Sequence, residues 1–206
     1  MEGDKESDLK QRIVSEGLRL FLHKGFRNTT INDIINAAGV SKGAFYWHFQ
    51  SKNELLETII KEFEEAFLDK AIDAVTRTRG SFLRKFKYYH KYITEFALHH
   101  KELCMGFMTV SAELAGNETD LENKIRRVYE KHRDFLKGLV TMGRKEQVLK
   151  KDLDTDMSAH VIMAINHGML LEWYMNQNTI DAKLLAKTYR EIILSGMLDE
   201  PEKINS

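Results

Sequence analysis

The chain of 206 residues lacks the features of secreted and membrane proteins. It has a single cysteine, Cys104, so no disulfide can form within the chain, and this residue lies in the apolar run LCMGFM, where a small core residue is expected. The sequence opens with the charged residues MEGDKESD and not with an apolar secretion signal, and no run approaches the roughly 20 apolar residues of a membrane span. We therefore expect a cytoplasmic protein with no membrane contact.

Proline is almost absent too, since Pro201 is the only one in the chain. Proline interrupts helices, whereas the abundant Leu, Lys and Glu favour them. Hydrophobic residues make up 43% of the chain and charged residues 30%, as in ordinary globular proteins. No segment indicates a sheet, and the sequence predicts an all-α fold of long helices.

Net charge is absent from the chain as a whole, but not from its parts. The segment from Ser7 to Lys52 holds seven Lys and Arg against three Asp and Glu, an excess of +4. The rest of the chain then holds 24 against 28, a net charge of −4. A basic segment of this kind is typical of a module that binds nucleic acid.

The most informative stretch runs from Thr30 to Lys52, TINDIINAAGVSKGAFYWHFQSK, inside this basic segment. Thr30 and Asp33 have the spacing of a capping box that opens a helix. Gly39 supplies the positive φ at which a helix stops, and Ser41 caps a second helix. This pattern predicts a helix-turn-helix, the motif that places its second helix in a DNA groove.

The second helix of this motif has two contrasting faces. Phe45 and Phe49 are four residues apart and are expected to point into the core. The opposite face carries the candidate contacts Gly43, Ala44, Tyr46 and Trp47. Donors for phosphate groups stand at or near the ends of the helix: Lys42, His48 and Lys52. A plain helical hairpin with stray surface aromatics is the alternative to a DNA-reading helix.

The segment VSKGAFYWHFQSKNELL resembles the recognition-helix signature of the TetR/AcrR transcriptional regulators, with GFRNTTINDI before it at the matching distance. The resemblance covers Ile13 to about Leu56. It implies an all-helical homodimer, most often a repressor, whose C-terminal domain binds a small effector. It also implies DNA contacts from the matching positions Thr30, Lys42, Gly43, Tyr46, Trp47, His48 and Lys52. Asn32 stands where several relatives have a base-reading arginine, so the operator sequence is not implied.

Helical periodicity along the whole chain predicts nine helices. Three of them belong to a DNA-binding domain (1–52) and about six to an effector-binding and dimerisation domain (53–206). Ser51 and Glu54 form a second capping box, which opens a helix that extends to Val75. Residues 1–6 and those after Leu198 are expected to be tails. The remaining helices are expected at residues 7–24, 82–98, 103–114, 121–142, 156–175 and 181–197.

Aromatic and Met residues are dense in two parts of the C-terminal domain, which suits an adaptable apolar pocket. The candidate pocket residues are Tyr89, Phe96, Phe107, Met108, His132, Asn166, His167, Trp173 and Tyr174. His132 interrupts an apolar stripe and is either a hydrogen-bonded core residue or a polar anchor for the effector. His160 and His167 share a helix face, but no Cys cluster or acidic pair accompanies them, so we expect no metal and no cofactor.

The last two helices need something to cover their apolar faces. Ala164 and Gly168 are small enough to let a second helix approach closely, which favours a homodimer over helices that only close the monomer core. We thus expect a repressor released from a palindromic operator in double-stranded DNA by a small hydrophobic or amphiphilic effector. Two alternatives remain: a ligand-independent architectural or partner-binding DNA protein, and a helical enzyme using His132 or His167, for which no nucleophile–base pair exists.

Overall fold

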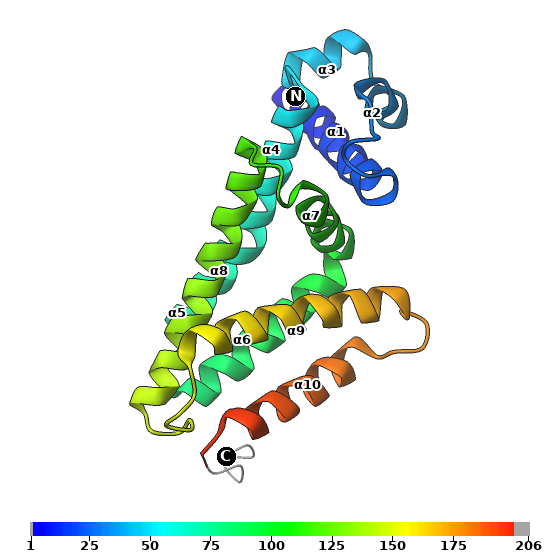
Figure 1. Ribbon diagram of the computed structural model, residues 1–206. Helices are drawn as coiled ribbons and strands as arrows, with labels where there is room; N and C mark the ends of the chain where they lie inside the picture. Colours follow the sequence, from blue (N-terminus) through cyan, green and yellow to red (C-terminus); the bar gives the residue numbers. More distant parts are fainter. Residues whose placement is uncertain (1, 200–206) are drawn as a thin grey trace. The chain divides into compact units, whose positions relative to one another are not determined.

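A computed structural model describes the backbone of residues 2–199 and the side chains of residues 6–199 (Figure 1). Within these residues it contains ten α-helices, one six-residue π-helical segment and no strand. The elements are α1 (Glu2–Lys24), α2 (Ile31–Ala38), α3 (Lys42–His48), α4 (Lys52–Phe63), η1 (Glu64–Asp69), α5 (Lys70–Arg77), α6 (Phe82–His99), α7 (Lys101–Leu114), α8 (Asp120–Lys145), α9 (Thr155–Met175) and α10 (Ala182–Met197). In this described part of the chain, none of the helices is both long and apolar enough to cross a membrane.

The all-α prediction is confirmed. Because α4, η1 and α5 follow one another without a break, they form one continuous helix. The described residues therefore contain nine continuous helices, the number predicted. The first helix begins at Glu2 and not at Ser7, so the N-terminal tail was predicted too long. The reason is that Lys and Glu are good helix formers, and acidic residues suit the N-terminal end of a helix dipole. The C-terminal tail lies almost wholly outside the described residues.

The chain divides into two compact units. Unit 1 comprises the chain up to Ala66 together with Glu102–Arg127, and unit 2 comprises Phe67–Lys101 together with the chain from Val128 onward. This division differs from the boundary expected after residue 52, because α4 and most of α7 pack with the first three helices. The ring of Phe63 on α4 stacks on that of Phe107 on α7, with centroids 3.9 Å apart.

Glycines allow close helix contacts inside unit 1. Gly106 on α7 lies against the side chain of Leu18 on α1, where a Cβ atom would overlap it. A Cβ at Gly17 would similarly lie 2.7 Å from a methyl group of Leu55 on α4. Cys104 is buried on α7, as the sequence predicts, and burial raises the pKa of its thiol to about 12, so it stays protonated.

The helix ends in unit 1 follow the predicted caps. Thr30 and Asp33 form the complete capping box of α2, and Gly39 ends this helix with a φ of 60°. The Ser41 hydroxyl accepts from the Ala44 amide at 3.1 Å and caps α3.

The predicted box at the start of α4 is only half formed. Ser51 accepts from the Glu54 amide as expected, but the Glu54 carboxylate accepts from the amide of Gln50 at 2.7 Å and not from that of Ser51.

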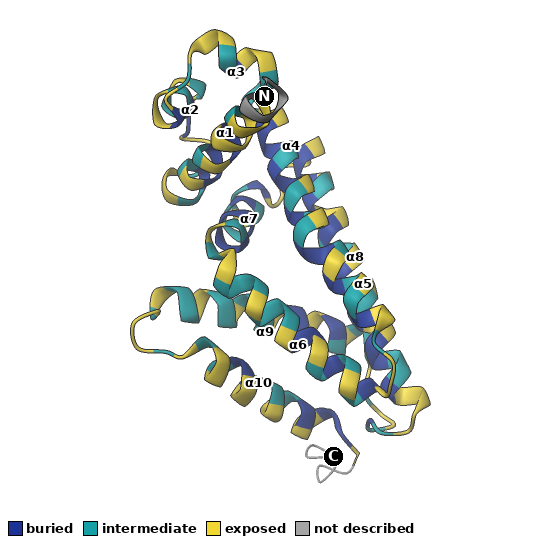
Figure 2. Cartoon of the chain, turned by 180° about the vertical axis from the view of Figure 1, so that it is seen from behind, coloured by how far each residue is buried: buried dark blue, intermediate teal, exposed yellow. Residues whose placement is uncertain are grey.

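The core of unit 2 is formed by α5, α6, α8, α9 and α10, with Phe82, Phe86, Leu136, Ile162 and Leu194 among its buried members. Not all apolar positions at helical spacing on the last two helices face this core, although on α10 Leu185 is half-buried and Ile193 packs against it. On α9 the stripe Val161, Ala164, Gly168 and Leu171 is exposed, and on α10 Thr188 and Ile192 are exposed (Figure 2). The residues buried instead are Ala159, Ile162, Met163, Ala186, Tyr189, Leu194 and Met197. The face of α9 that carries Ala164 and Gly168, for which the sequence favours a second copy as cover, is thus not buried in the single chain.

Two glycines of α8 provide a matched test of this packing. A Cβ at Gly143 would lie 2.8 Å from the Phe82 ring and 2.7 Å from a Leu149 methyl group, whereas a Cβ at Gly138 meets nothing within 4 Å. We expect Gly143→Ala to lower the free energy of unfolding by about 1–3 kcal/mol through overpacking. Gly138→Ala should raise it by about 0.5–1 kcal/mol, because alanine is the better helix former. Urea unfolding followed by circular dichroism measures both, and equal effects would contradict the packing.

Candidate nucleic-acid interface and ligand site

Helix α3 is anchored from one side and open on the other. Phe45 and Phe49 are buried, as predicted, and their rings lie 5.9 Å apart in the core of unit 1. On the opposite face Trp47 is 76% exposed and Tyr46 37% exposed. This confirms the prediction that α3 has one buried face and one exposed face. Gly43 is exposed between them, so the backbone of α3 itself is accessible. The anchored face fixes the direction in which the aromatic face points.

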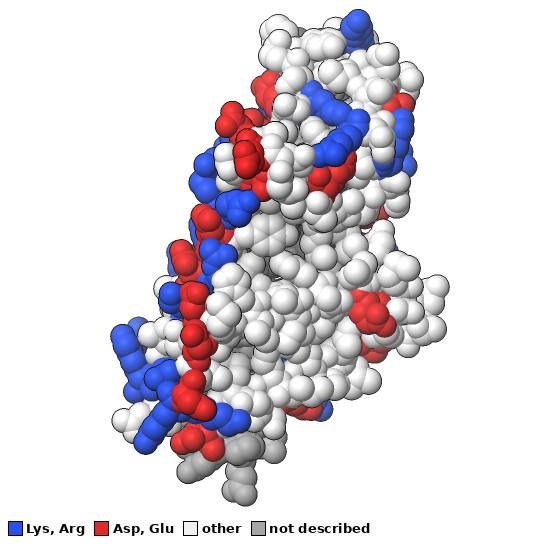
Figure 3. Space-filling model, in the orientation of Figure 1, with Lys and Arg blue, Asp and Glu red and all other residues white. Residues whose placement is uncertain are grey.

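Polar groups surround this open face. The Trp47 indole N–H donates to the Glu6 carboxylate of α1 at 2.9 Å, and the Lys42 ammonium lies 6.0 Å from the centre of the Tyr46 ring. Ala44 and His48 are half-buried at its edges. On the side of unit 1 that Figure 3 shows, the Lys and Arg side chains do not form one continuous patch. Charge alone therefore gives the open face of α3 little selectivity for one binding partner over another. Its shape and its hydrogen-bonding groups must supply that selectivity.

Thr30 is committed to the start of α2. Its hydroxyl accepts from the Asp33 amide and lies 2.8 Å from the Asp33 carboxylate, which also pairs with Lys24 at 2.6 Å. The Lys24 ammonium, together with the hydrogen bonds from Thr30, holds the pKa of Asp33 well below its usual range. We therefore expect the carboxylate to stay ionised, and the cap to persist, at neutral and mildly acidic pH.

Lys52, predicted as a phosphate donor, is engaged inside unit 1. Its ammonium donates to the carbonyl groups of Phe26 at 2.6 Å and Thr29 at 2.7 Å, and it lies 4.4 Å from the Phe26 ring centre. Burial lowers the pKa of this ammonium, and the nearby charge of Glu113 opposes that change. In this structure Lys52 therefore holds the loop between α1 and α2 in place, which the sequence analysis missed.

Glu113 on α7 completes this contact and was also missed. Its carboxylate accepts from the backbone amides of Phe26 at 2.6 Å and Arg27 at 2.7 Å. The side chain of Arg27 donates in turn to Asn117 at 2.5 Å. Because Glu113 stands 86 residues after Arg27 in the chain, no local pattern could have identified this contact.

In unit 2 the structure brings three predicted pocket residues together. The Tyr89 hydroxyl lies 2.7 Å from His132 Nε2, and Asn166 Nδ2 donates to the same hydroxyl at 3.1 Å. The single hydroxyl proton of Tyr89 therefore goes to His132, whose Nε2 accepts. Burial, with a smaller effect of His167, lowers the pKa of His132 to about 3 and keeps the ring neutral. Of the two interpretations of His132, the hydrogen-bonded core residue fits this geometry.

The other predicted pocket residues are divided between the units. Phe96 lies 5.0 Å from Phe67 in unit 2, and His167 lies 5.4 Å from Tyr129. Trp173 and Tyr174 are half-buried near the end of α9. Phe107 and Met108 belong to unit 1, because α7 packs with α1 and α4.

Two buried residues of unit 2 were missed by the sequence analysis. His90 on α6 and Tyr189 on α10 have ring centres 5.0 Å apart, and burial lowers the pKa of His90 to about 3 and raises the pKa of Tyr189. His90 Nε2, the Tyr189 hydroxyl and Asn166 Oδ1 are buried without a hydrogen-bond partner among the described residues. His90 follows Phe86 by four positions, and this spacing on a buried stripe was the available signal.

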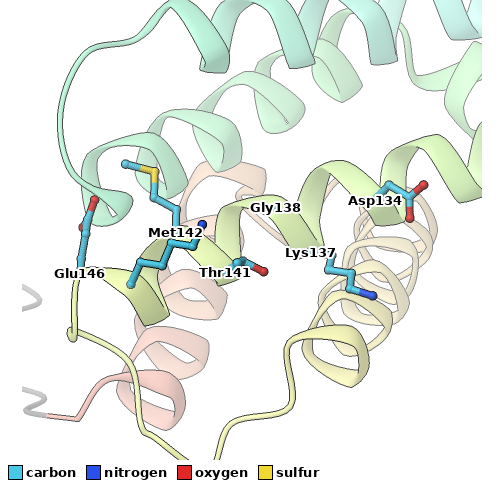
Figure 4. Close-up of a pocket in the computed structure, with 7 residues that line it drawn as sticks. Asp134, Lys137, Gly138, Thr141, Met142 and Glu146 are labelled. Carbon is cyan, nitrogen blue, oxygen red and sulfur yellow. The ribbon is translucent and has the colours of Figure 1, made fainter.

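A surface groove of about 760 Å³ lies along α8 (Figure 4). Its lining includes Asp134, Lys137, Thr141 and Glu146, and it contains none of the predicted pocket residues. Lys137 already pairs with Asp156 at 2.9 Å, and Glu146 accepts from the Phe82 amide at 2.9 Å. Within the described residues no group of three or more His, Cys, Asp or Glu side chains is arranged to hold a metal ion.

Comparison with known proteins covers nearly the whole chain. Residues 13–59 match the bacterial regulatory proteins of the tetR family, and residues 60–196 match the C-terminal region of the YsiA-like proteins. The regulator AcrR of Shigella flexneri is 24% identical over 193 residues, which cover 93% of this chain and 90% of that protein.

Solved structures share this fold. The regulator MbdR of Azoarcus sp. CIB superposes with a TM-score of 0.83 at 26% identity, over 91% of this chain and 98% of its own. The ketosteroid regulator KstR2 of Mycobacterium tuberculosis gives 0.80 at 21% identity, over 93% and 95%. FadR of Bacillus subtilis, solved in complex with stearoyl-CoA, gives 0.74 at 20% identity, over 90% and 98%.

Lys52 donates to backbone carbonyls inside unit 1, whereas Lys42 is exposed, so substitution of the two lysines should have different effects. Lys52→Ala removes the donor to the 26–29 carbonyls, so we expect a lower melting temperature together with weaker DNA binding. Lys42→Ala should leave the melting temperature unchanged and lower the affinity for any duplex, with a salt slope reduced by about one. Circular dichroism melts and anisotropy titrations with a random-sequence duplex at several salt concentrations measure both. A Lys52→Ala variant that melts like the parent would refute the loop-holding role.

Proposed function

The chain belongs to the TetR family of bacterial transcriptional regulators, and from that premise we propose that it is a dimeric repressor which a small hydrophobic effector releases from a palindromic operator. The family consists of DNA-binding regulators and not of enzymes. The operator, the dimer and the effector are the finer parts of this proposal, and each rests on a different face of the molecule.

The observation that carries the DNA-binding role is the exposed face of α3. A helix that presents an exposed Trp47 and Tyr46 beside Gly43, while Phe45 fixes it from behind, is built for a partner on that face. Gly43 allows the backbone to come close to the groove, and the aromatic rings and Lys42 supply contacts to bases and phosphates. In a twofold dimer, two such helices would enter major grooves about 34 Å apart.

The dimer is proposed from the outer faces of α9 and α10. Large apolar side chains are exposed on both helices, including Met175 at 73% and Ile192 at 67%. The others are Met157, Val161, Leu171 and Leu184. Figure 3 shows the surface over α9 as largely free of charged side chains. Ala164 and Gly168 lie on the exposed face, and a second copy of the same helices could pack closely against them.

The effector is proposed from unit 2 and from the relatives. FadR binds stearoyl-CoA in its solved complex, and KstR2 is described as a ketosteroid regulator. In this chain the second halves of α6 and α9 carry aromatic, Met and Leu side chains that are half-buried. An effector there would release DNA only if it binds the DNA-free conformation more tightly than the DNA-bound one. A ligand-independent architectural protein is the alternative, and it would show no such coupling.

The proposed dimer has a matched pair of variants. Gly168 on α9 and Gly138 on α8 are both exposed helical positions where a Cβ meets nothing within 4 Å, so arginine is tolerated by the single chain at either site. We expect Gly168→Arg to bring the mass measured by light scattering from two subunits to one, while Gly138→Arg keeps the parent's mass. Equal helicity of the two variants excludes unfolding as the cause. A parent that scatters as a monomer at micromolar concentration would rule out the dimer.

The repressor proposal is tested on DNA selected from a random duplex library. We expect an inverted repeat to be recovered, and Trp47→Ala to weaken binding to it at least tenfold more than to random DNA. Stearoyl-CoA and unesterified fatty acids should raise the melting temperature because they bind the folded state. They should also weaken operator binding, because effector affinity and operator affinity are reciprocally linked. If ligands bind but leave the operator affinity unchanged, the architectural alternative is correct.

A further inference from the structure

The described part of unit 2 contains three polar atoms that are buried and have no hydrogen-bond partner: His90 Nε2, Asn166 Oδ1 and the hydroxyl oxygen of Tyr189. His90 is 1% exposed and Tyr189 6% exposed. An unpartnered buried polar group costs about 1–3 kcal/mol of stability, so three in one unit are a considerable cost. Groups kept at such a cost are candidates for contacts with a ligand or with buried water.

The three residues come from neighbouring helices and surround Tyr89. Helices α6, α9 and α10 lie side by side and share the core of unit 2 (Figures 1 and 2). The His90 ring lies 5.0 Å from the Tyr189 ring and 5.2 Å from the Tyr89 ring. Asn166 donates to the Tyr89 hydroxyl, and burial, with a smaller effect of the nearby Tyr189 phenol, raises the pKa of Tyr89.

Tyr89 cannot itself satisfy these atoms. Its hydroxyl gives its one proton to His132 and accepts from Asn166 Nδ2. With Nδ2 as the donor to Tyr89, Asn166 keeps Oδ1 as an acceptor. Tyr189 has both a proton to donate and a lone pair to accept with, and His90 Nε2 does one or the other according to its tautomer.

These atoms lie where the packed core of unit 2 ends. The first half of α6 is buried at Phe82, Phe86, Tyr89 and His90, but none of residues 91–99 is buried. On α9 the last buried residue is Met163, and none of residues 164–175 is buried. Half-buried apolar side chains follow on both helices: Tyr92, Ile93, Phe96, Ile165, Met169, Leu170 and Trp173. Polar atoms thus stand at one end of a loosely packed apolar region, as in sites for apolar ligands with one polar group.

We propose that His90, Asn166 and Tyr189 bind an uncharged hydroxyl group carried by the hydrophobic effector, an inference that rests on the proposed function. A hydroxyl both donates and accepts, so it can serve the Asn166 acceptor and the Tyr189 donor together. A carboxylate would face the Asn166 carbonyl oxygen and bring a buried charge. Arg190 is the charged group close enough to affect His90, and a carboxylate ligand therefore belongs among the probes.

The first test needs no ligand. Tyr189→Phe removes only the hydroxyl that has no partner, so the variant should melt at the parent's temperature or above it. Tyr88→Phe is the control, since that phenol is exposed on α6 and its loss should change nothing. If Tyr189→Phe melts several degrees lower than the parent, its hydroxyl already bonds to protein or to buried water, and the proposal is overturned.

The second test uses probes of one chain length, 1-decanol, 2-decanone and decanoate, measured by displacement of a fluorescent apolar dye. We expect the parent to bind decanol at least fivefold more tightly than the other two. Tyr189→Phe and His90→Leu should bind all three about equally, and His90→Gln, which keeps a polar group near the Nε2 position, should retain part of the preference. No binding of decanol, or an unchanged preference in the variants, overturns the proposal.

Both tests are done without DNA, so they are independent of repressor release. A decanol preference that depends on Tyr189, without any effect on operator affinity, would retain the site and reject effector-driven release. Release of the operator by other molecules, together with no preference for decanol, would retain effector-driven release and reject the hydroxyl site.

Discussion

The position of the recognition helix depends on how the loop between α1 and α2 satisfies its backbone. Within this loop one turn bond joins the Thr29 amide to the Phe26 carbonyl at 3.3 Å, and side chains from other helices bind further amides and carbonyls. The Glu113 carboxylate accepts from the amides of Phe26 and Arg27, and the Lys52 ammonium donates to the carbonyls of Phe26 and Thr29. Both side chains are charged, which makes these hydrogen bonds stronger than neutral ones. The loop in turn sets the start of α2, and α2 with its turn sets α3.

Because Glu113 lies on α7 and Lys52 begins α4, this loop joins three segments that are distant in the chain. Within unit 1, two hydrogen bonds from the amides of Phe26 and Arg27 to Glu113 connect this loop to α7. The segment is expected by sequence to belong with the effector domain, yet it contacts α1, α4 and the loop that precedes the helix-turn-helix.

Unit 2 is governed by a different constraint, the satisfaction of buried polar groups. From the sequence, His132 is either a hydrogen-bonded core residue or a polar anchor for an effector. The structure fits the first, because the Tyr89 hydroxyl bonds to it and the low pKa of the ring keeps it neutral. The unsatisfied atoms belong to His90, Asn166 and Tyr189. The polar residues available to a ligand are thus those that the packing leaves without a partner, and not the residue that interrupts an apolar stripe.

The sequence by itself determined the features that depend on neighbouring residues. These are the helices, the caps at Thr30 and Ser41, the stop at Gly39, and the inward and outward faces of α3, all of which follow from spacings of two to four positions. Only the tertiary structure decided the role of Lys52, the contact of Glu113, the buried face of α9 and the pairing of His132. These depend on contacts between residues far apart in the chain. On α9, where every face is apolar, the spacing of residues carries no information on which face is buried.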